Sequence, residues 1–340
     1  MLDQLLAQRN VPALLERTQM LDILQKEVYG YLPPKPEALS FTETKFDFYT
    51  DCCRSGAFEA SGMLNGREFS FPFHVTVPND GKPHPFFVHL NFRGEKGFDM
   101  YRPTEEVTLH GFGVINLCYK DVTSDDGDFT NGLAGVLYPD GVRKPTDPGK
   151  IALWAWAAHR MMDFAESRPD LFDCSRACVC GHSRLGKTAL LAGATDERFC
   201  VVCSNCSGCT GAAISRDKEG EKVARICERF PYWFCENYYQ YGGREREMPF
   251  DQHYLIASSA PRCVLVGSAS LDAWADPISE QLSCLAAAPA FGGDFQCDRP
   301  AQAGDTFLKG KLGYHLRKGS HVFCRTDWLR LIEFCKLHMR

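Results

Sequence analysis

The chain has 340 residues, 44% of them hydrophobic and 24% charged, so it is long enough to bury a sizeable core. With 38 Lys and Arg against 43 Asp and Glu, its formal charge of −5 gives no reason to expect nucleic acid or an anionic membrane surface as a partner. The longest apolar runs are far too short to span a bilayer. No repeat or long linker divides residues 1–340, and we expect one α/β domain.

Residues 1–36 are expected to form an N-terminal helical extension. The first 30 alternate charge and leucine, as an amphipathic helix does, and the segment Pro33-Pro34-Lys35-Pro36 would end it. These residues lack the basic start and unbroken apolar segment of a signal peptide, which favours a cytoplasmic location.

The rest of the chain predicts strands that later alternate with helices. Residues 39–79 alternate apolar and polar side chains, as antiparallel strands do, with Asn65-Gly66 as a hairpin turn. Further strands are predicted at 86–91, 112–118, 177–180, 199–204, 263–268 and 312–317, and helices at 151–166, 275–287 and 326–338. This alternation predicts a mostly parallel central sheet with helices on both faces.

Two long segments interrupt this alternation. Residues 119–147 form a loop rich in Gly, Asp and Pro, and a loop of that length is unusual unless it serves function. Residues 207–250 are rich in charged and aromatic side chains, and we expect an inserted loop region near the active site.

The most informative stretch is Val-Cys-Gly-His-Ser-Arg-Leu-Gly-Lys at 179–187. Gly181, Ser183 and Gly186 approximate the Gly-x-Ser-x-Gly nucleophile elbow, with the second glycine one place late. An apolar strand precedes the motif and a small-residue helix follows it, which is the context that exposes a nucleophilic serine above a sheet. The alternative is a Ser-Arg helix cap in an ordinary α/β protein.

The 17 cysteines favour a reducing compartment, because most lie within apolar segments where cysteine behaves as a small hydrophobic residue. Cys200, Cys203, Cys206 and Cys209 are spaced C-x2-C-x2-C-x2-C, which resembles part of an iron–sulfur binding run. The competing interpretation is a strand over 199–204, which would send Cys200 and Cys203 to opposite faces. We therefore expect no metal site.

A serine nucleophile needs a base and a carboxylate that orients the base, in the order Ser, Asp or Glu, His for an α/β-hydrolase. Asp272 follows the strand over 263–268, and His321 follows the last predicted strand. Together with Ser183 they lie at carboxyl ends of strands, so they can converge on one rim of the sheet. Asp276 competes with Asp272 but precedes a proline, which favours a helix cap.

Three other histidines are weaker candidates. His315 lies inside a strand pattern and is expected to be packed. His182 neighbours the serine, but we expect the turn to direct its side chain elsewhere. His253, at a helix start, is expected to have a structural or supporting role.

Several motifs occur together and in order, and jointly they resemble bacterial members of the glucuronoyl esterase family, carbohydrate esterase family fifteen. The resemblance runs from about Tyr29 to the C-terminus. The motifs are Gly181-His-Ser-Arg-Leu-Gly-Lys, Ser207-Gly-Cys-Thr-Gly-Ala-Ala, Gly220-Glu221, Phe230-Pro-Tyr-Trp-Phe, Asp272-x-Trp274-Ala-Asp-Pro, and Gly319-x-His321 with Asp327-Trp328.

The resemblance implies an α/β-hydrolase fold, no metal or other cofactor, and cleavage of esters of 4-O-methyl-glucuronic acid. It implies that Ser183 is the nucleophile, His321 the base, and Arg184 a stabiliser of the oxyanion. Many family members carry the acid of the triad where this chain has Cys206, which cannot take the role of a carboxylate. Some bacterial members have an acid after the next strand, so Asp272 is the residue we assign.

The resemblance further implies that Lys187 and Glu221 bind hydroxyls of the uronate sugar and that Trp274 offers it an apolar face. From the residues alone, Lys187 and Glu221 would be a solvated pair on a helix and a loop. A cytoplasmic enzyme would not meet lignin, so we expect a small-molecule or oligosaccharide uronate ester as the partner, with the oligomeric state open.

Three alternatives remain at this point. The chain could be an acetyl esterase acting on xylan fragments, which shares the triad but needs no pocket for a sugar acid. It could be a carbohydrate-binding pseudoenzyme whose triad is impaired by Cys206. The third alternative is a redox or iron–sulfur protein.

Overall fold

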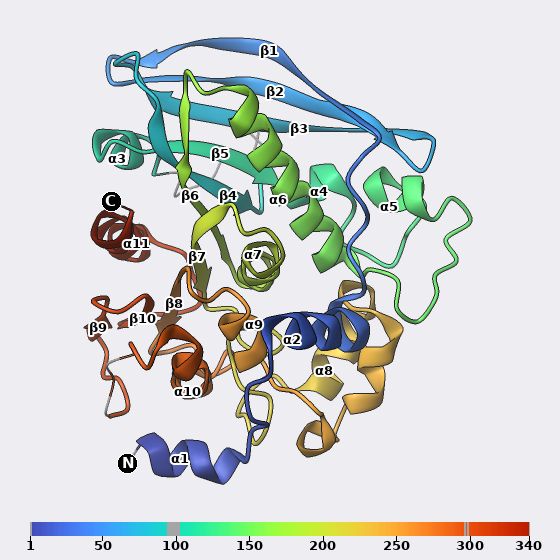
Figure 1. Cartoon of the computed structure of the whole chain (residues 1–340), viewed down its shortest axis with the longest axis vertical. Coiled ribbons are helices and arrows are strands. Elements are labelled where there is room, and N and C mark those ends of the chain that lie inside the picture. Colours follow the sequence, from blue (N-terminus) through green and yellow to red (C-terminus); the bar gives the residue numbers. More distant parts are fainter. Residues whose placement is uncertain (1, 94–102, 296, 298, 340) are drawn as a thin grey trace.

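Ten strands form a sheet that is antiparallel at one side and parallel across its centre (Figure 1). The structure is a computed structural model, and it describes residues 2–93, 103–295, 297 and 299–339. The strands, in sheet order, are β1 (Ala38–Thr50), β2 (Cys53–Leu64), β3 (Arg67–Pro78), β5 (Gly113–Cys118), β4 (His84–Asn91), β6 (Phe172–His182), β7 (Phe199–Asn205), β8 (Cys263–Ala269), β10 (Leu312–Arg317) and β9 (Thr306–Phe307).

The pairing follows the sequence prediction. β1, β2, β3 and β5 pair antiparallel, and Asn65 and Gly66 both take the positive φ that a tight hairpin turn between β2 and β3 requires. β5, β4, β6, β7, β8 and β10 then pair parallel. The carboxyl ends of β6, β7, β8 and β10 therefore lie side by side at one rim.

Helices cover both faces of the parallel part. The longer helices are α6 (Lys150–Ser167), α7 (Arg184–Thr195), α10 (Pro277–Ala287) and α11 (Arg325–His338). The first three bury apolar residues in one large core, whereas α11 packs in a smaller core on the other face (Figure 1). Strand β6 serves both: Ala177 and Val179 face the large core, and Cys178 and Cys180 face the smaller one. The α/β-hydrolase fold with a mostly parallel sheet is confirmed.

The N-terminal extension differs from the prediction of one helix. It contains α1 (Leu2–Arg9), α2 (Arg17–Leu24) and a π-helical turn, η1 (Gln25–Tyr29). The chain between α1 and α2 contains Pro12, which cannot supply a helical N–H. Arg17 ties this extension to the fold by donating hydrogen bonds to the carbonyls of Ser258 and Ala194, each at 2.8 Å.

The remaining helices are short. The segment 119–147 contains two of them, and 207–250 folds into short helices beside η1 and α6. They are α3 (Thr104–Leu109), α4 (Tyr119–Val122), α5 (Gly132–Leu137), α8 (Val223–Arg229), η2 (Pro231–Trp233), η3 (Glu236–Tyr241), η4 (Glu245–Glu247), α9 (His253–Ala257) and η5 (Ala288–Phe291). None of the described helices combines the length and apolar character needed to cross a bilayer.

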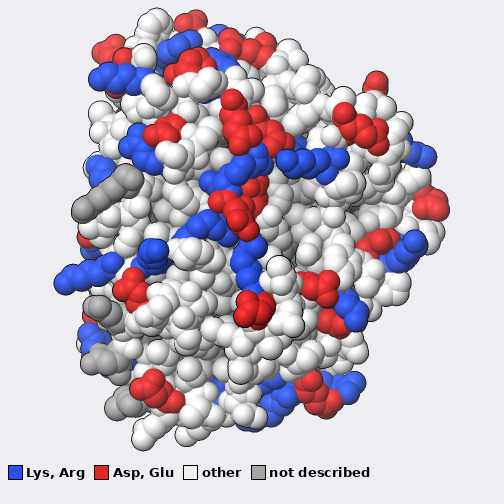
Figure 2. All heavy atoms as spheres, in the orientation of Figure 1, with Lys and Arg blue, Asp and Glu red and all other residues white. Residues whose placement is uncertain are grey.

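The face of the molecule seen in Figure 2 carries basic and acidic side chains interleaved with one another. No large area of one sign stands out on this face, in keeping with the nearly balanced charge of the chain.

Candidate active site

Ser183 stands at a sharp turn between β6 and α7. Its φ of 57° and ψ of −126° are backbone angles that a residue with a side chain rarely adopts. The two glycines of the motif make this turn possible. A Cβ on Gly181 would lie 2.2 Å from the carbonyl oxygen of Leu185, and one on Gly186 would lie 3.0 Å from Oγ of Ser204. The late second glycine therefore allows the close approach of α7 to the end of β7.

Asp272 and His321 meet at the rim beside this turn. Nδ1 of His321 lies 2.6 Å from Oδ2 of Asp272. Asp272 is buried, while the His321 side chain is 43% exposed. Burial acts to raise the pKa of Asp272, but the hydrogen bond and the charge of His321 outweigh it and lower the pKa below its usual value. The carboxylate is thus ionised and able to orient the imidazole.

Arg317, at the end of β10, holds the loop that carries His321. Its guanidinium donates hydrogen bonds to the carbonyls of Ser320, at 2.8 Å, and Val322, the residues on either side of the histidine. It also pairs with the buried carboxylate of Asp327 at 2.7 Å. Sequence reasoning placed Asp327 only within a family motif and did not foresee this support.

His182 lies in the site, contrary to the expectation that the turn directs it elsewhere. Its ring centroid is 4.4 Å from that of His321, and Nδ1 is 2.8 Å from the amide oxygen of Asn205. Burial, followed by the charge of His321, lowers the pKa of His182 to about 4, so it stays neutral beside the other histidine. Within the described residues, no hydrogen bond joins the Ser183 hydroxyl to His321, a looseness that is common before a substrate is bound.

The competing candidates have structural roles. Asp276 caps α10, since its carboxylate accepts hydrogen bonds from the backbone N–H and hydroxyl of Ser279. His315 is buried in β10, with Nε2 3.9 Å from Asp327. His253 is buried, and its Nε2 lies 3.0 Å from the carbonyl of Pro12. The structure therefore places Asp272, and not Asp276, against His321.

Arg184 is the first residue of α7, and its guanidinium is held by a carboxylate that the sequence did not single out. Asp125, in the long loop over 119–147, pairs with the Arg184 guanidinium. The same carboxylate accepts hydrogen bonds from the hydroxyl of Tyr119 and from Nε1 of Trp233, each at 2.8 Å. The guanidinium carbon also lies 4.6 Å from the Trp233 ring centroid. The two long segments that interrupt the strand–helix alternation thus meet at Arg184.

The loop that carries Asp125 is itself anchored by Lys150, at the start of α6. The Lys150 ammonium is buried and donates hydrogen bonds to the hydroxyl of Thr123, at 3.0 Å, and to the carbonyl of Asp128, at 2.6 Å. Burial lowers the pKa of Lys150 to about 8. The only sequence signal for this arrangement was the unusual length of the loop.

Lys187 and Glu221 are buried, so they are not the solvated pair that their residue types alone would suggest. The Lys187 ammonium donates a hydrogen bond to the carbonyl of Ser207, and burial lowers its pKa. The backbone N–H of Glu221 is fixed at 3.1 Å on the carbonyl of Trp274, whose side chain is 50% exposed. The exposed Trp274 and the buried Glu221 are therefore joined through their backbones.

Glu280, a buried residue of α10, joins the turn at Gly208 to strand β8. Its carboxylate accepts hydrogen bonds from the backbone N–H of Gly208, at 2.8 Å, and from the hydroxyl of Ser268. Burial raises the pKa of Glu280 to about 7, although both hydrogen bonds oppose the shift. No sequence pattern distinguished this residue from an ordinary helical glutamate.

The four regularly spaced cysteines do not gather around one point. Cys200 and Cys203 lie on β7, where the Cys200 thiol is 3.2 Å from the carbonyl of Ala177. Cys206 follows β7 with a φ of 47° and lies beside Asp272 and His321 instead. Burial raises the pKa of the Cys206 thiol well above its ordinary value, so it carries no charge that could orient a histidine at neutral pH.

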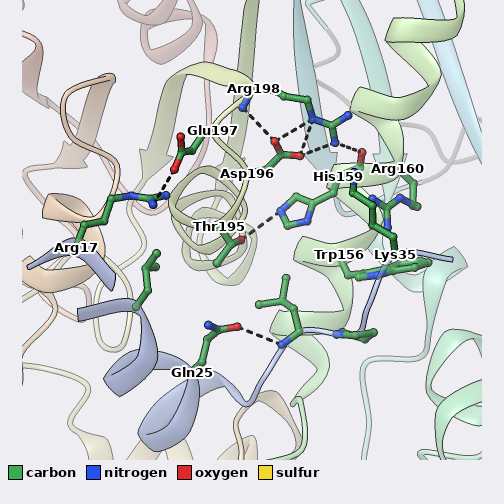
Figure 3. A pocket seen from close by; sticks show the side chains of 13 residues that line it. Arg17, Gln25, Lys35, Trp156, His159, Arg160, Thr195, Asp196, Glu197 and Arg198 are labelled. Carbon is green, nitrogen blue, oxygen red and sulfur yellow. Dashed lines mark hydrogen bonds and ion pairs between the residues drawn. The ribbon is translucent and has the colours of Figure 1, made fainter. Parts of the chain in front are cut away.

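A separate cavity of about 800 Å³ lies between the N-terminal extension and helices α6 and α7. Figure 3 shows its charged side chains turned toward one another, with Arg17 on Glu197 and Arg198 on Asp196. Neither the elbow serine nor the Asp272–His321 pair lines it. Arg17 and Arg198 are thus paired with carboxylates of the cavity wall itself, which favours a structural gap between the extension and the fold.

The fold and the site define an α/β-hydrolase with a serine at a nucleophile elbow and an aspartate–histidine pair on the same rim. Comparisons with known proteins agree. The family model for glucuronyl esterases of fungi matches residues 62–292. A carbohydrate esterase from an unknown prokaryotic organism is 41% identical over 241 residues, which cover 69% of this chain and 55% of that protein.

Two further relatives support the same assignment. A 4-O-methyl-glucuronoyl methylesterase of Schizophyllum commune is 25% identical over 329 residues, covering 89% of this chain and 76% of that protein. The structure of a glucuronoyl esterase from Solibacter usitatus superposes with a TM-score of 0.85 at 30% identity, covering 95% of this chain and 92% of that one. The chain belongs to the glucuronoyl esterase family, carbohydrate esterase family 15. It spans about half the length of the prokaryotic relative.

Proposed function

We propose that the protein is a serine esterase that hydrolyses esters of glucuronic acid or 4-O-methyl-glucuronic acid through an acyl-enzyme. The observation that carries this proposal is the 2.6 Å contact between Asp272 and His321, on the same rim as the elbow serine in a member of this family. His321 takes the proton of the Ser183 hydroxyl as the serine attacks the ester carbonyl, and the alcohol leaves with that proton. Water then releases the uronate by the reverse sequence.

Arg184 is proposed to stabilise the negative charge that develops on the carbonyl oxygen. A guanidinium held by Asp125 and Trp233 needs little rearrangement when that charge forms, and preorganised donors of this kind lower the barrier most effectively. Because α7 begins directly after Ser183, a backbone N–H at its first turn is proposed to assist in binding the oxyanion.

The sugar is proposed to bind between Lys187, Glu221 and Trp274. Lys187 supplies a hydrogen-bond donor and Glu221 an acceptor for hydroxyl groups, and both are buried, so each hydrogen bond is worth more than at the surface. The exposed Trp274 ring offers an apolar face to the ring of a sugar or to an apolar leaving alcohol.

This arrangement argues against two of the alternative functions, the pseudoenzyme and the iron–sulfur protein. A pseudoenzyme was suggested by the neutral Cys206, but Asp272 occupies the position against His321 that an orienting acid needs. An iron–sulfur centre would require the four spaced thiols to converge, whereas within the described residues the one group of three or more ligating side chains contains only Cys206 from that run.

The decisive experiment compares wild type and Ser183→Ala on the methyl ester of glucuronic acid and on an acetylated xylo-oligosaccharide. We expect acid release from the glucuronate ester by wild type and none above background in the variant. Activity on the acetyl ester alone would overturn the substrate assignment while keeping the nucleophile. Equal activity of wild type and variant would overturn the nucleophile itself.

A further inference from the structure

Three side chains that can bind a metal ion meet at the carboxyl ends of three neighbouring strands. Cys206 follows β7, Asp272 follows β8 and His321 follows β10, and these strands are adjacent and parallel in the sheet. One ligand atom from each residue lies within 4.8 Å of the other two. This is the one such group of three within the part of the chain that the structure describes.

The thiol of Cys206 is aimed at this point by its backbone. The φ of 47° at Cys206 is in the left-handed region that residues with side chains rarely adopt. The backbone N–H of Cys206 donates a 2.7 Å hydrogen bond to the carbonyl of Gly267 on β8, which fixes the turn. Within the described residues the thiol itself forms no hydrogen bond, so a ligand would not have to displace a partner.

We propose that Cys206, Asp272 and His321 form an inhibitory site for a thiophilic divalent cation such as Zn²⁺. Thiolate, imidazole and carboxylate are the ligands that zinc takes in proteins, and three protein ligands with one open position are a common arrangement. Metal–ligand bonds of about 2.0 to 2.3 Å place ligand atoms roughly 3.4 to 3.7 Å apart. The Asp272 and His321 atoms would separate by about 1 Å from their present 2.6 Å, and the exposed loop carrying His321 can supply that movement.

Inhibition follows from which nitrogen the metal takes. Nδ1 of His321 faces Asp272, so a cation held between them binds Nδ1 through its lone pair. The proton that Nδ1 otherwise directs toward Asp272 is displaced, and the neutral ring carries its one proton on Nε2, the nitrogen that must accept the serine proton in the proposed reaction. The Cys206 thiol releases one proton to solvent and becomes the thiolate ligand, while Asp272 is already ionised. No atom changes its oxidation state. His321 cannot act as the base for as long as the cation stays bound.

The inhibitory consequence rests on the proposed esterase function, but binding does not. Binding is therefore measured separately, with Co²⁺ as the probe, through the thiolate-to-cobalt charge-transfer absorption in the near ultraviolet. We expect this band in wild type and in Ser183→Ala, and its loss in Cys206→Ser and Cys206→Ala. The matched control is Cys52→Ser, because Cys52 is a partly exposed thiol next to Cys53 that could bind a soft metal outside the proposed site.

Turnover is measured in the same variants with increasing Zn²⁺, each relative to its own activity without metal. We expect the zinc concentration for half inhibition to rise about tenfold or more in both Cys206 variants and to stay unchanged in Cys52→Ser. Absence of the cobalt band in wild type, or its persistence in both Cys206 variants, would overturn the proposal. If no variant hydrolyses any ester, the proposed function fails, while the cobalt spectra still decide whether the site exists.

Discussion

The two sides of the candidate site are built in different ways. On one side, Asp272 and His321 follow the paired parallel strands β8 and β10, so the sheet itself brings them together. On the other side, Arg184 is held by Asp125 and Trp233, which come from the two long segments over 119–147 and 207–250 and not from paired strands. Backbone pairing therefore positions Asp272 and His321, whereas buried side-chain contacts position Arg184.

This difference predicts how each side responds to mutation. A side positioned by the sheet should fail through the chemistry of the altered group alone, with the fold unaffected. A side positioned by contacts among loops should fail when any one contact is lost, even if that residue never touches substrate.

The largest effect is expected from Asp272→Asn. Asparagine keeps the shape of the side chain but cannot stabilise the imidazolium that forms during attack, and an equivalent change in a serine hydrolase triad lowers kcat about 10⁴-fold. We expect a loss of about 10³-fold or more in kcat on the glucuronate methyl ester, with thermal stability nearly unchanged. Steady-state kinetics and a thermal melt measure the two quantities.

Asp276→Asn is the matched control, because Asp276 is four residues away and caps α10. Asparagine is also a good helix cap, so we expect a change in unfolding free energy below about 1 kcal/mol and a small change in kcat. Similar losses of kcat in the two variants would contradict the assignment of Asp272.

The same contrast explains what could be predicted from sequence. Ser183, Asp272 and His321 each follow an apolar strand pattern, and because parallel strands share one carboxyl rim, their meeting could be inferred. The sheet order, the short helices within 119–147 and the support of His321 by Arg317 could not, because they depend on tertiary contacts that leave no periodicity in the sequence.

Asp125 shows this limit most clearly. It is one of several acidic residues in the loop over 119–147, next to Asp126 and near Asp128, and nothing in their spacing separates them. Only the folded chain shows that the Asp125 side chain is 7% exposed and accepts three hydrogen bonds. His182 shows the opposite error: a turn that presents a serine also brings the preceding ring against His321.

A smaller effect is expected from Asp125→Asn. The amide would turn a donor toward Tyr119, Trp233 or Arg184, which are all donors themselves, so the guanidinium would lose its fixed position. We expect kcat to fall about 10- to 100-fold with little change in KM, because removing a single oxyanion donor outright costs about 10²- to 10³-fold.

Asp126→Asn is the control on the same loop, since Asp126 is exposed and its carboxylate accepts hydrogen bonds from Ser124 and Asp128 and not from the groups around Arg184. The double variant Asp125→Asn with Arg184→Ala sharpens the test. If Asp125 acts through Arg184, its mutation should cost little more once Arg184 is absent. Fully multiplicative losses would show that Asp125 acts in another way.

The smallest catalytic effect, and a clear effect on stability, is expected from Glu280→Gln. Glu280 joins the turn at Gly208, after β7, to Ser268 on β8. Its pKa of about 7 in the folded protein exceeds the ordinary value of 4.5, so between these two pH values the folded chain holds a proton that the unfolded chain has lost. The contribution of this carboxyl to stability therefore falls as pH rises from 5 to 8, by up to about 3 kcal/mol.

Glutamine can accept the Gly208 hydrogen bond through Oε1 and donate from Nε2 to the Ser268 hydroxyl, as the protonated carboxyl can. It does not titrate, so Glu280→Gln should remove this pH dependence. Urea unfolding of wild type and variant at pH 5 and pH 8 measures their free energies of unfolding. The difference between the two free energies cancels the titration of every other group. We expect the variant to gain stability relative to wild type at pH 8 while its kcat stays within a few-fold. A constant difference between the proteins at both pH values would mean that Glu280 is ionised in the fold. The carboxylate would then hold Gly208 and Ser268 by charge-assisted hydrogen bonds.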